Sequence, residues 1–228
     1  DIVFSGNCAL LREEEEEEEE GGGGVSTTTE DGESVVTCIY DGVYSMVRYA
    51  ESAVCASSSD WVHWKKRLCI GPSQAGRPGQ AGPSYESQLQ HDTAIWRDGP
   101  GGTWYALSGG CTFNGTNDNT TGAPCRGNAQ LWNSTDLKSF TYVGPIARER
   151  DGPGAYWELP YLLPFDANGQ PLDNYHHASA SQYALMFGGS GRRNSYWVGQ
   201  YEAKAFTPRG STEKAWPEPK ATDNAGAY

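Results

Sequence analysis

The stretch from residue 93 to residue 107 reads Thr-Ala-Ile-Trp-Arg-Asp-Gly-Pro-Gly-Gly-Thr-Trp-Tyr-Ala-Leu. The β-branched and aromatic residues in 93–96 and 103–107 favour two strands, because such side chains fit a pleated surface. Gly and Pro dominate residues 97–102, and both residue types favour tight turns. The stretch therefore predicts an antiparallel hairpin.

Short segments of the same texture lie on both sides of this hairpin. Strands are expected at 2–4, 35–40, 128–132, 140–143, 157–164, 182–187 and 196–201, and one or two more within 43–64, around 44–49. Turns are expected at Asp41-Gly42, at 134–138 and at 188–194. No long window repeats its apolar residues with a helical period, so we expect an all-β fold, with antiparallel sheets stacked as propeller blades or as a sandwich.

Composition agrees with this fold and narrows the partners. The chain has 228 residues with 29 Gly, 13 Pro, 13 Tyr and 8 Trp, and its formal charge is −12. Eight of the acids form the run Glu13–Glu20, and without it 17 basic residues face 21 acidic ones, a balance of −4. We expect a disordered low-complexity insertion at 12–34. An acidic chain argues against nucleic acid as a partner, and no apolar run approaches the roughly 18 residues of a membrane span.

Six cysteines and three glycosylation sequons bear on the compartment. The cysteines are Cys8, Cys38, Cys55, Cys69, Cys111 and Cys125, and the sequons begin at Asn114, Asn119 and Asn133. An even cysteine count permits disulfides, and together with the sequons it predicts a secreted glycoprotein. A cytosolic protein with free thiols is the alternative. The chain contains no Cys-x-x-Cys pair and no glycine-rich phosphate loop leading into a helix, so we expect neither a metal nor another cofactor.

Two carboxylates stand out as candidate catalytic groups. Glu158 lies in the run Ala155-Tyr-Trp-Glu-Leu-Pro-Tyr-Leu-Leu-Pro164, and Asp92 opens the strand of the central hairpin. A carboxyl surrounded by rings has a raised pKa, as a general acid requires. Alternatively, Glu158 is an exposed residue of an alternating strand and Asp92 a turn residue. Paired carboxylates among aromatic side chains suit glycoside hydrolysis, although a lectin would have a similar composition.

The order of several segments resembles glycoside hydrolase family 32, which includes invertases, inulinases, levanases and fructosyltransferases. Four segments carry the resemblance: Val3-Phe-Ser-Gly6, 36–42 ending in Ile-Tyr-Asp-Gly, His91-Asp-Thr-Ala-Ile-Trp96, and Gly154-Ala-Tyr-Trp-Glu-Leu-Pro160. Residues 128–140 and 196–208 resemble two further segments of the family in the same order.

The resemblance implies that residues 1–228 are an incomplete N-terminal domain: about three blades of a five-bladed β-propeller, without the family's C-terminal β-sandwich. It implies a glycosidase that acts on β-fructofuranosides, sucrose or fructans, with retention of configuration. Glu158 would be the acid/base and Asp92 the transition-state stabiliser. The sugar would be bound by Phe4, Ser5, His91 and Trp157. The protein would be secreted, to the cell wall or vacuole.

Departures from the family's pattern keep other functions open. The family's nucleophile is an Asp in a Trp-Met-Asn-Asp-Pro-Asn-Gly motif, which residues 1–228 do not contain. His91 and Thr93 stand where the family has Arg and Pro, and Leu159 replaces a Cys. We therefore expect the 228 residues alone to be inactive. A non-catalytic carbohydrate-binding relative, a fructosyltransferase, and an unrelated structural or adhesive β protein remain the alternatives, and the sequence leaves the oligomeric state open.

Overall fold

The computed structural model describes ten segments of the chain. They are 3–11, 35–43, 51–70, 91–99, 102–113, 125–148, 157–172, 177–189, 192–212 and 215–222. The expected insertion at 12–34, the expected strand at 44–49 and the sequons at Asn114 and Asn119 lie outside these segments.

In the described segments, thirteen strands form three antiparallel sheets. The first sheet contains β1 (Val3–Leu11), β2 (Val35–Val43), β3 (Glu51–Ser58) and β4 (Lys65–Ile70). The second contains β5 (His91–Arg97), β6 (Trp104–Phe113), β7 (Cys125–Ser134) and β8 (Thr141–Arg148). The third contains β9 (Trp157–Phe165), β10 (Gln182–Gly189), β11 (Arg192–Glu202) and β12 (Ala205–Pro208), and β13 (Lys220–Ala221) pairs with β11. A single 3-10 turn, η2 (His177–Ser179), is the only helical element of the described residues.

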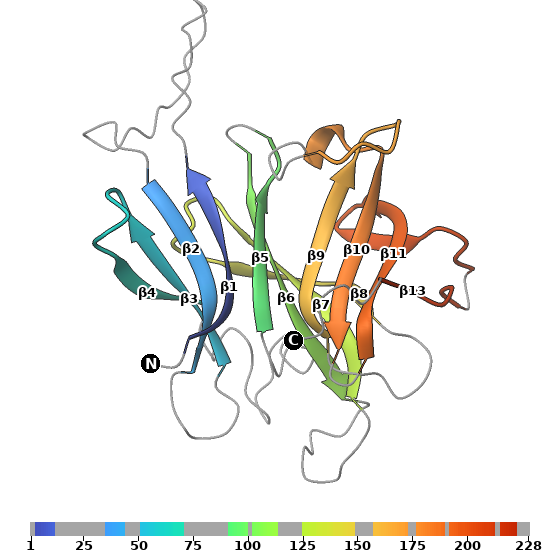
Figure 1. Ribbon diagram of the computed structural model, residues 1–228, viewed down its shortest axis with the longest axis horizontal. Helices are drawn as coiled ribbons and strands as arrows, with labels where there is room; N and C mark the ends of the chain where they lie inside the picture. Colours follow the sequence, from blue (N-terminus) through green and yellow to red (C-terminus); the bar gives the residue numbers. More distant parts are fainter. Residues whose placement is uncertain are drawn as a thin grey trace, which may run out of the picture.

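Within each sheet the first four strands follow one another in sequence order, and the three sheets stand side by side (Figure 1). The first strand of each sheet lies toward the middle of the molecule, where β5 packs against both β1 and β9. Sheets that fan out from a shared line of inner strands are propeller blades. The structure thus confirms the expected all-β fold, a partial β-propeller with three blades among the described residues.

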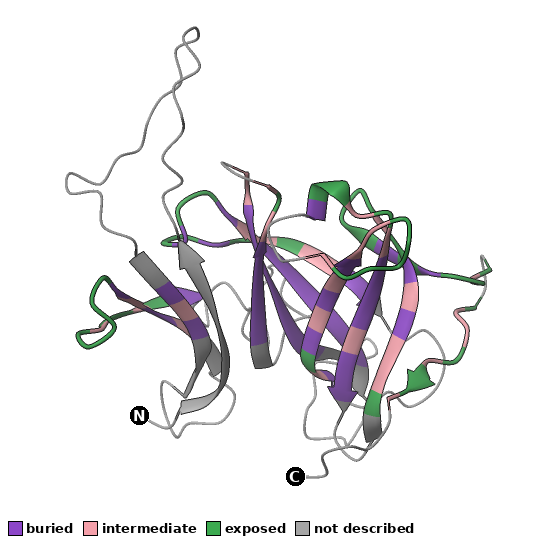
Figure 2. Ribbon diagram, turned by 45° about the horizontal axis from the view of Figure 1, so that its top comes forward, coloured by how far each residue is buried: buried purple, intermediate pink, exposed green. Residues whose placement is uncertain are grey.

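The hydrophobic cores lie between the blades, and the middle blade is buried on both faces (Figure 2). Successive strand residues point to opposite faces, so Ile95 faces the first blade while Trp96 faces the third. In the same way Trp104 faces the first blade and Tyr105 the third. Each fully buried apolar side chain contributes about 2 kcal/mol to the stability of the folded state. The alternating side chains of blade 2 therefore hold it against both neighbouring blades.

The expected hairpin at the centre of the chain is confirmed. The backbone N–H of Asp98 donates to the Thr103 carbonyl at 3.1 Å, and that of Gly102 donates to the Gly99 carbonyl at 3.1 Å. Gly99 has φ +75°, a left-handed conformation that glycine adopts without a Cβ penalty.

One expectation about blade 1 is wrong, and one of its strands was not expected. Asp41 and Gly42 do not form a turn, because they pair with Ala53 and Ser52 inside the hydrogen-bonded ladder of β2. The outer strand β4 was not anticipated, since it begins Lys-Lys-Arg and exposes much of its length. A disulfide between Cys55 and Cys69, with Cα atoms 5.6 Å apart, links β4 to β3.

Candidate functional site

All six residues that the sequence nominates lie where the inner strands begin. Phe4 and Ser5 are the second and third residues of β1, His91 and Asp92 open β5, and Trp157 and Glu158 open β9. The three inner strands run in the same direction, so these beginnings meet at one end of the molecule, the lower end in Figure 1. The side chains of Phe4, Ser5, His91 and Asp92 lie outside the described ones.

Each inner strand carries an irregularity at this end. The pairing register shifts within Val3–Gly6 of β1, within His91–Ala94 of β5 and within Glu158–Tyr161 of β9. In every case three steps along the inner strand lie opposite two steps along its neighbour, the mark of a β-bulge. A bulge redirects side chains and is common beside active sites. The same device therefore occurs three times, once at each pair of candidate residues.

Glu158 is half-buried and lies at the start of the bulge in β9. The next residue, Leu159, has φ +48° and is 43% exposed, whereas Pro160 is buried. A positive φ is uncommon for a leucine, so the backbone departs from regular pairing directly after the candidate acid. The bulge therefore interrupts the alternation of side chains along β9, and Glu158 lies before the interruption.

A glycine lets two blades approach closely beneath Glu158. A Cβ placed on Gly109 of β6 would lie 2.2 Å from the carbonyl oxygen of Trp157 and 3.3 Å from Cα of Glu158. No other residue fits at such a contact. Gly109 is also the cross-strand partner of His91. The close approach therefore sets Glu158 beside the strand position where His91 and Asp92 begin β5.

A second glycine lies on the other side of Glu158. Gly188 of β10 pairs with Glu158, and a Cβ added to it would lie 3.8 Å from Cβ of Glu158 and 3.1 Å from Oδ1 of Asn194. The candidate acid thus has a glycine neighbour in each adjoining strand. Sequence reasoning missed Gly109, although a glycine inside a strand is a known signal of close backbone approach.

Trp157 holds a different place from the one expected of a sugar-binding ring. Its side chain is 1% exposed and stacks on Phe187, with ring centroids 4.2 Å apart and planes at 21°. On the same core, Trp197 lies 5.6 Å away. The indole is enclosed by the core of blade 3, so it anchors the backbone of Glu158 instead of presenting an open face.

A buried hydrogen bond steadies the strand next to Asp92. The hydroxyls of Thr93 and Ser108 lie 2.8 Å apart, and both residues are buried. Thr93 stands where the family has a proline, and the hydroxyl bond joins β5 to β6 at the bulge. Farther across the sheet, Tyr142 donates to Gln130, whose amide donates to Asn128 at 2.7 Å. Blade 2 is therefore cross-linked by polar contacts near its candidate residues.

The opposite ends of the inner strands hold another titratable group. Asp98 accepts a hydrogen bond from Tyr105 and faces Lys204, but burial dominates and raises the pKa of Asp98. Lys204 Nζ lies 5.0 Å above the Tyr105 ring. Burial also raises the pKa of Tyr183 to about 12 and that of Tyr201 further. These groups connect blade 3 to blade 2. They offer a single carboxylate, where glycoside hydrolysis requires two.

Two further kinds of feature bear on the described segments, a cluster of metal ligands and a helix that could span a bilayer. Within them, no cluster of three or more His, Cys, Asp or Glu side chains is placed to hold a metal ion. Among the same residues, no helix has the length and apolarity to cross a bilayer.

Comparisons with known proteins are consistent with this geometry. The profile of the glycosyl hydrolases family 32 N-terminal domain matches residues 11–223. Among solved structures, the chain is similar to sucrose-6-phosphate hydrolase from Lactobacillus gasseri, with a TM-score of 0.53 and 20% identity, covering 82% of this chain and 34% of that one. It is also similar to the family 32 β-fructofuranosidase of Bombyx mori, solved as a variant in complex with sucrose.

For the Bombyx mori enzyme the TM-score is 0.50 and the identity 17%, covering 79% of this chain and 35% of that one. At such identities the likeness concerns the fold. The chain spans about a third of the length of either relative. No sequence among the curated proteins matches it.

Proposed function

This chain belongs to glycosyl hydrolase family 32, whose N-terminal domain matches residues 11–223, and from that premise we propose that the polypeptide carrying it cleaves β-fructofuranosides with retention of configuration. Sucrose or a fructan would be the substrate. One observation carries the proposal: Glu158 stands on a bulged inner strand, and Gly109 brings it beside the start of β5, where Asp92 lies.

Glu158 would act as the acid/base. Its carboxyl would donate a proton to the leaving glycosidic oxygen as the bond to fructose breaks. The fructosyl group would pass to the nucleophile, and the carboxylate of Glu158 would then take a proton from the water that breaks this fructosyl–nucleophile bond, releasing fructose and the nucleophile and restoring the acid. In this proposal the nucleophile comes from outside residues 1–228, because they contain no Trp-Met-Asn-Asp-Pro-Asn-Gly motif. Residues 1–228 alone would be inactive for the same reason.

The other inner-strand residues would surround the sugar. Asp92 would bond fructose hydroxyls and stabilise the positive charge of the transition state. His91, Phe4 and Ser5 would shape the sugar subsite from β5 and β1. Trp157, enclosed at 1% exposure, would act by holding the backbone that carries Glu158.

We place the protein in the secretory pathway, with the cell wall or vacuole as its destination. The Cys55–Cys69 disulfide supports this, because disulfides persist in oxidising compartments. Cys38 is also disulfide-bonded. Asn133, the described sequon residue, is half-buried near the end of β7, so glycosylation there is part of the proposal.

Replacing Glu158 tests the function. Glu158→Gln keeps the shape of the side chain but removes its proton transfer, so kcat on sucrose or a fructan should fall by about 10²–10⁴-fold. The matched control is Glu202→Gln, an exposed glutamate at the end of β11, which should leave kcat unchanged. Both variants are made in the longest polypeptide that the source encodes around residues 1–228.

The outcome separates the alternatives. If Glu158→Gln retained more than about half of the wild-type rate, the acid/base assignment would be wrong. A wild-type protein that binds sucrose without cleaving it would be a non-catalytic carbohydrate-binding relative. Transfer of fructose to a second sugar in preference to water would identify a fructosyltransferase.

A further inference from the structure

Two outer turns of the molecule have the same construction. One joins β3 to β4 and the other joins β7 to β8. In the first, Ser58 donates to the Asp60 carboxylate at 3.0 Å and accepts the Asp60 backbone N–H at 3.3 Å. In the second, Ser134 and Asp136 form the same two bonds at 3.1 Å and 3.3 Å.

The likeness continues beyond the aspartate. Oδ1 of Asp60 accepts the backbone N–H groups of Val62 and His63, two and three residues on, at 2.9 Å and 2.7 Å. Asp136 accepts the equivalent N–H groups of Lys138 and Ser139 at 2.7 Å and 3.0 Å. The residue after each aspartate is left-handed: Trp61 has φ +61° and Leu137 has φ +54°.

In blade 2 this left-handed residue is a wedge between blades. Leu137 is 1% exposed and belongs to the core that blade 2 shares with blade 1. Its carbonyl accepts a hydrogen bond from Arg67 Nη2 of β4 at 2.5 Å. The corresponding turn of blade 3, between β11 and β12, also contacts the preceding blade, because Lys204 lies over the Tyr105 ring of blade 2. The third-to-fourth-strand turn of each of these blades therefore contacts the blade before it.

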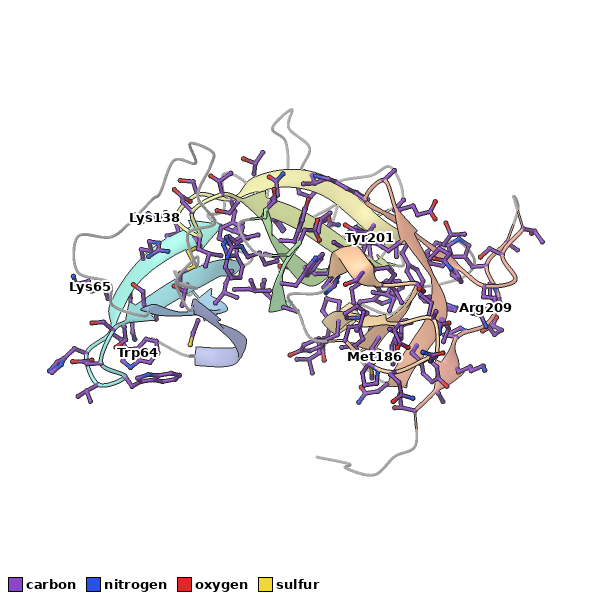
Figure 3. All side chains as sticks on the ribbon, turned by 90° about the horizontal axis from the view of Figure 1, so that it is seen from above. Trp64, Lys65, Lys138, Met186, Tyr201 and Arg209 are labelled. Atoms are coloured by element: carbon purple, nitrogen blue, oxygen red, sulfur yellow. A yellow bond between two sulfur atoms is a disulfide. The ribbon has the colours of Figure 1, made fainter. Side chains whose placement is uncertain are left out.

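In blade 1 the same position has no blade to enter within the described residues. Trp61 is 63% exposed and Val62 is 73% exposed. Trp64 lies beside them, donating its indole N–H to the Trp61 carbonyl at 3.2 Å. The turn forms the outer edge of the first sheet, on the side away from blade 2 (Figures 2 and 3). A bulky residue with positive φ is a strained choice for an exposed turn.

We propose that the turn Ser58–Trp64 is a docking surface for a further blade of the same polypeptide, which buries Trp61 as blade 1 buries Leu137. Two observations identify this occupant: the repeated turn already forms one interface between blades, and the chain spans only about a third of its solved relatives. The docked blade offers Trp61 an apolar seat at its outer strands, the region of blade 1 that receives Leu137.

Two other occupants fit the exposed rings less well. A sugar stacks on one open aromatic face, but Trp61 and Trp64 meet edge-on at 85°, which presents no common flat surface. In a second copy of the chain, one of the three described blades would have to bury Trp61 against its apolar residues. Each occupant has a distinct outcome in the test below.

Glycine substitution tests the proposal by the sign of its effect on the melting temperature. Glycine removes the penalty of a positive φ, so at an exposed position it raises stability. At a buried position it leaves a cavity, and the loss of packing prevails. Trp61→Gly, made in the longest polypeptide that the source encodes around these residues, should lower the melting temperature by about 5 °C or more.

Two matched variants calibrate the two directions. Leu137→Gly removes a wedge already seen buried, and it should lower the melting temperature as Trp61→Gly does. Ala203→Gly acts on an exposed residue with φ +48°, and it should raise the melting temperature slightly. Trp61→Leu, which places the blade 2 wedge in blade 1, should recover part of the loss.

The results separate the occupants. A fall for Trp61→Gly that does not change with protein concentration supports a blade of the same chain. A rise like that of Ala203→Gly overturns the proposal, as does a fall that disappears on dilution, which would identify a second copy. A fall seen only in the presence of sucrose would also overturn it and would identify a sugar platform.

Discussion

The inner strands β1, β5 and β9 behave differently at their two ends. Where they begin, each carries a bulge, and Gly109 brings the backbones of two blades into contact. Where they finish, pairing is regular, and aromatic side chains fill the space between blades 2 and 3. Trp96 stacks there on Tyr105, with centroids 5.4 Å apart, and meets the edge of Tyr201 at 6.5 Å.

The difference shows how one set of strands would serve packing at one end and the proposed chemistry at the other. Regular pairing sends alternate residues into the cores on either side of a blade. One extra residue reverses that alternation. At the bulged end, Trp157 and Glu158 pair in regular register, and the extra residue after Glu158 sets both apart from the alternation of the rest of β9. We conclude that the bulges separate a site end from a packing end within the same strands.

Among the variants that compare the two ends, replacing the Asp92 carboxylate with an amide should have the largest effect on kcat. Asp92→Asn should lower kcat by about 10²–10³-fold, the usual loss when a charge that stabilises the transition state is removed. The loss should be similar for substrates with good and poor leaving groups, because the role proposed for Asp92 includes no proton transfer. Steady-state kinetics on sucrose and on an aryl fructoside measures both.

Asp98→Asn is the control at the packing end, directly after the last residue of β5. It makes the same chemical change and should leave kcat unchanged. Equal losses in the two variants would show that the two ends of β5 do not differ in function.

The glycine beneath Glu158 should matter for both stability and rate. In Gly109→Ala the new Cβ would meet the Trp157 carbonyl at 2.2 Å, so the strands must separate, at a cost of about 1–3 kcal/mol in the free energy of unfolding. The displacement also moves Glu158, so kcat of the folded protein should fall. Denaturant unfolding and kinetics well below the melting temperature measure the two effects.

Gly199→Ala is the matched steric control, because its Cβ would meet the Thr207 carbonyl at the same 2.2 Å. Gly199 lies in the outer part of blade 3, where it pairs with Pro208. This variant should lose stability but keep its kcat. If both variants kept kcat, the close approach at Gly109 would have no part in placing the acid.

The smallest expected effect is a pH dependence at the packing end. Burial raises the pKa of Asp98 above its ordinary 3.8, so just above that pH the folded protein holds a proton that the unfolded chain has lost. Stability from this group is present at low pH and is lost as the pH rises through the folded pKa. As the pH rises from about 3.5 to 7, wild type should therefore lose stability that Asp98→Asn keeps. The resulting gain of the variant over wild type should be less than about 1 kcal/mol, because the side chain is exposed in part.

Melting curves at both pH values measure this difference. A gain at the lower pH instead would mean that Lys204 outweighs burial and that the charged form is the favoured one.

The sequence predicted what depends on local pattern. The alternation in 93–107 and the Gly-rich turn gave the central hairpin, and Trp157–Pro164 became β9 nearly to its bounds. The outer strand β4 was not predicted, because it begins with Lys65, Lys66 and Arg67, and its two adjacent buried residues, Cys69 and Ile70, do not show the alternation of a strand. The turn expected at Asp41-Gly42 was wrong because these residue types favour turns, whereas pairing with β3 keeps them within strand β2.

For the site, the sequence nominated residues but not their arrangement. Segment order identified Glu158 and Asp92, yet nothing local shows that their strands begin at one end of the molecule. The bulges are visible only in the pairing register. The burial of Trp157 was missed, because an aromatic residue beside a candidate acid is equally compatible with a sugar platform and with a core.

The most direct test of the account is the dependence of Glu158→Gln on the leaving group. If Glu158 donates the proton, its loss should weigh heavily on sucrose and much less on a fructoside whose leaving group needs no protonation. Because the same residue is the base for the incoming water, the remaining deficit should shrink further when azide is added. This pattern would place proton transfer at Glu158. An equal loss on both substrates, unchanged by azide, would contradict the assignment.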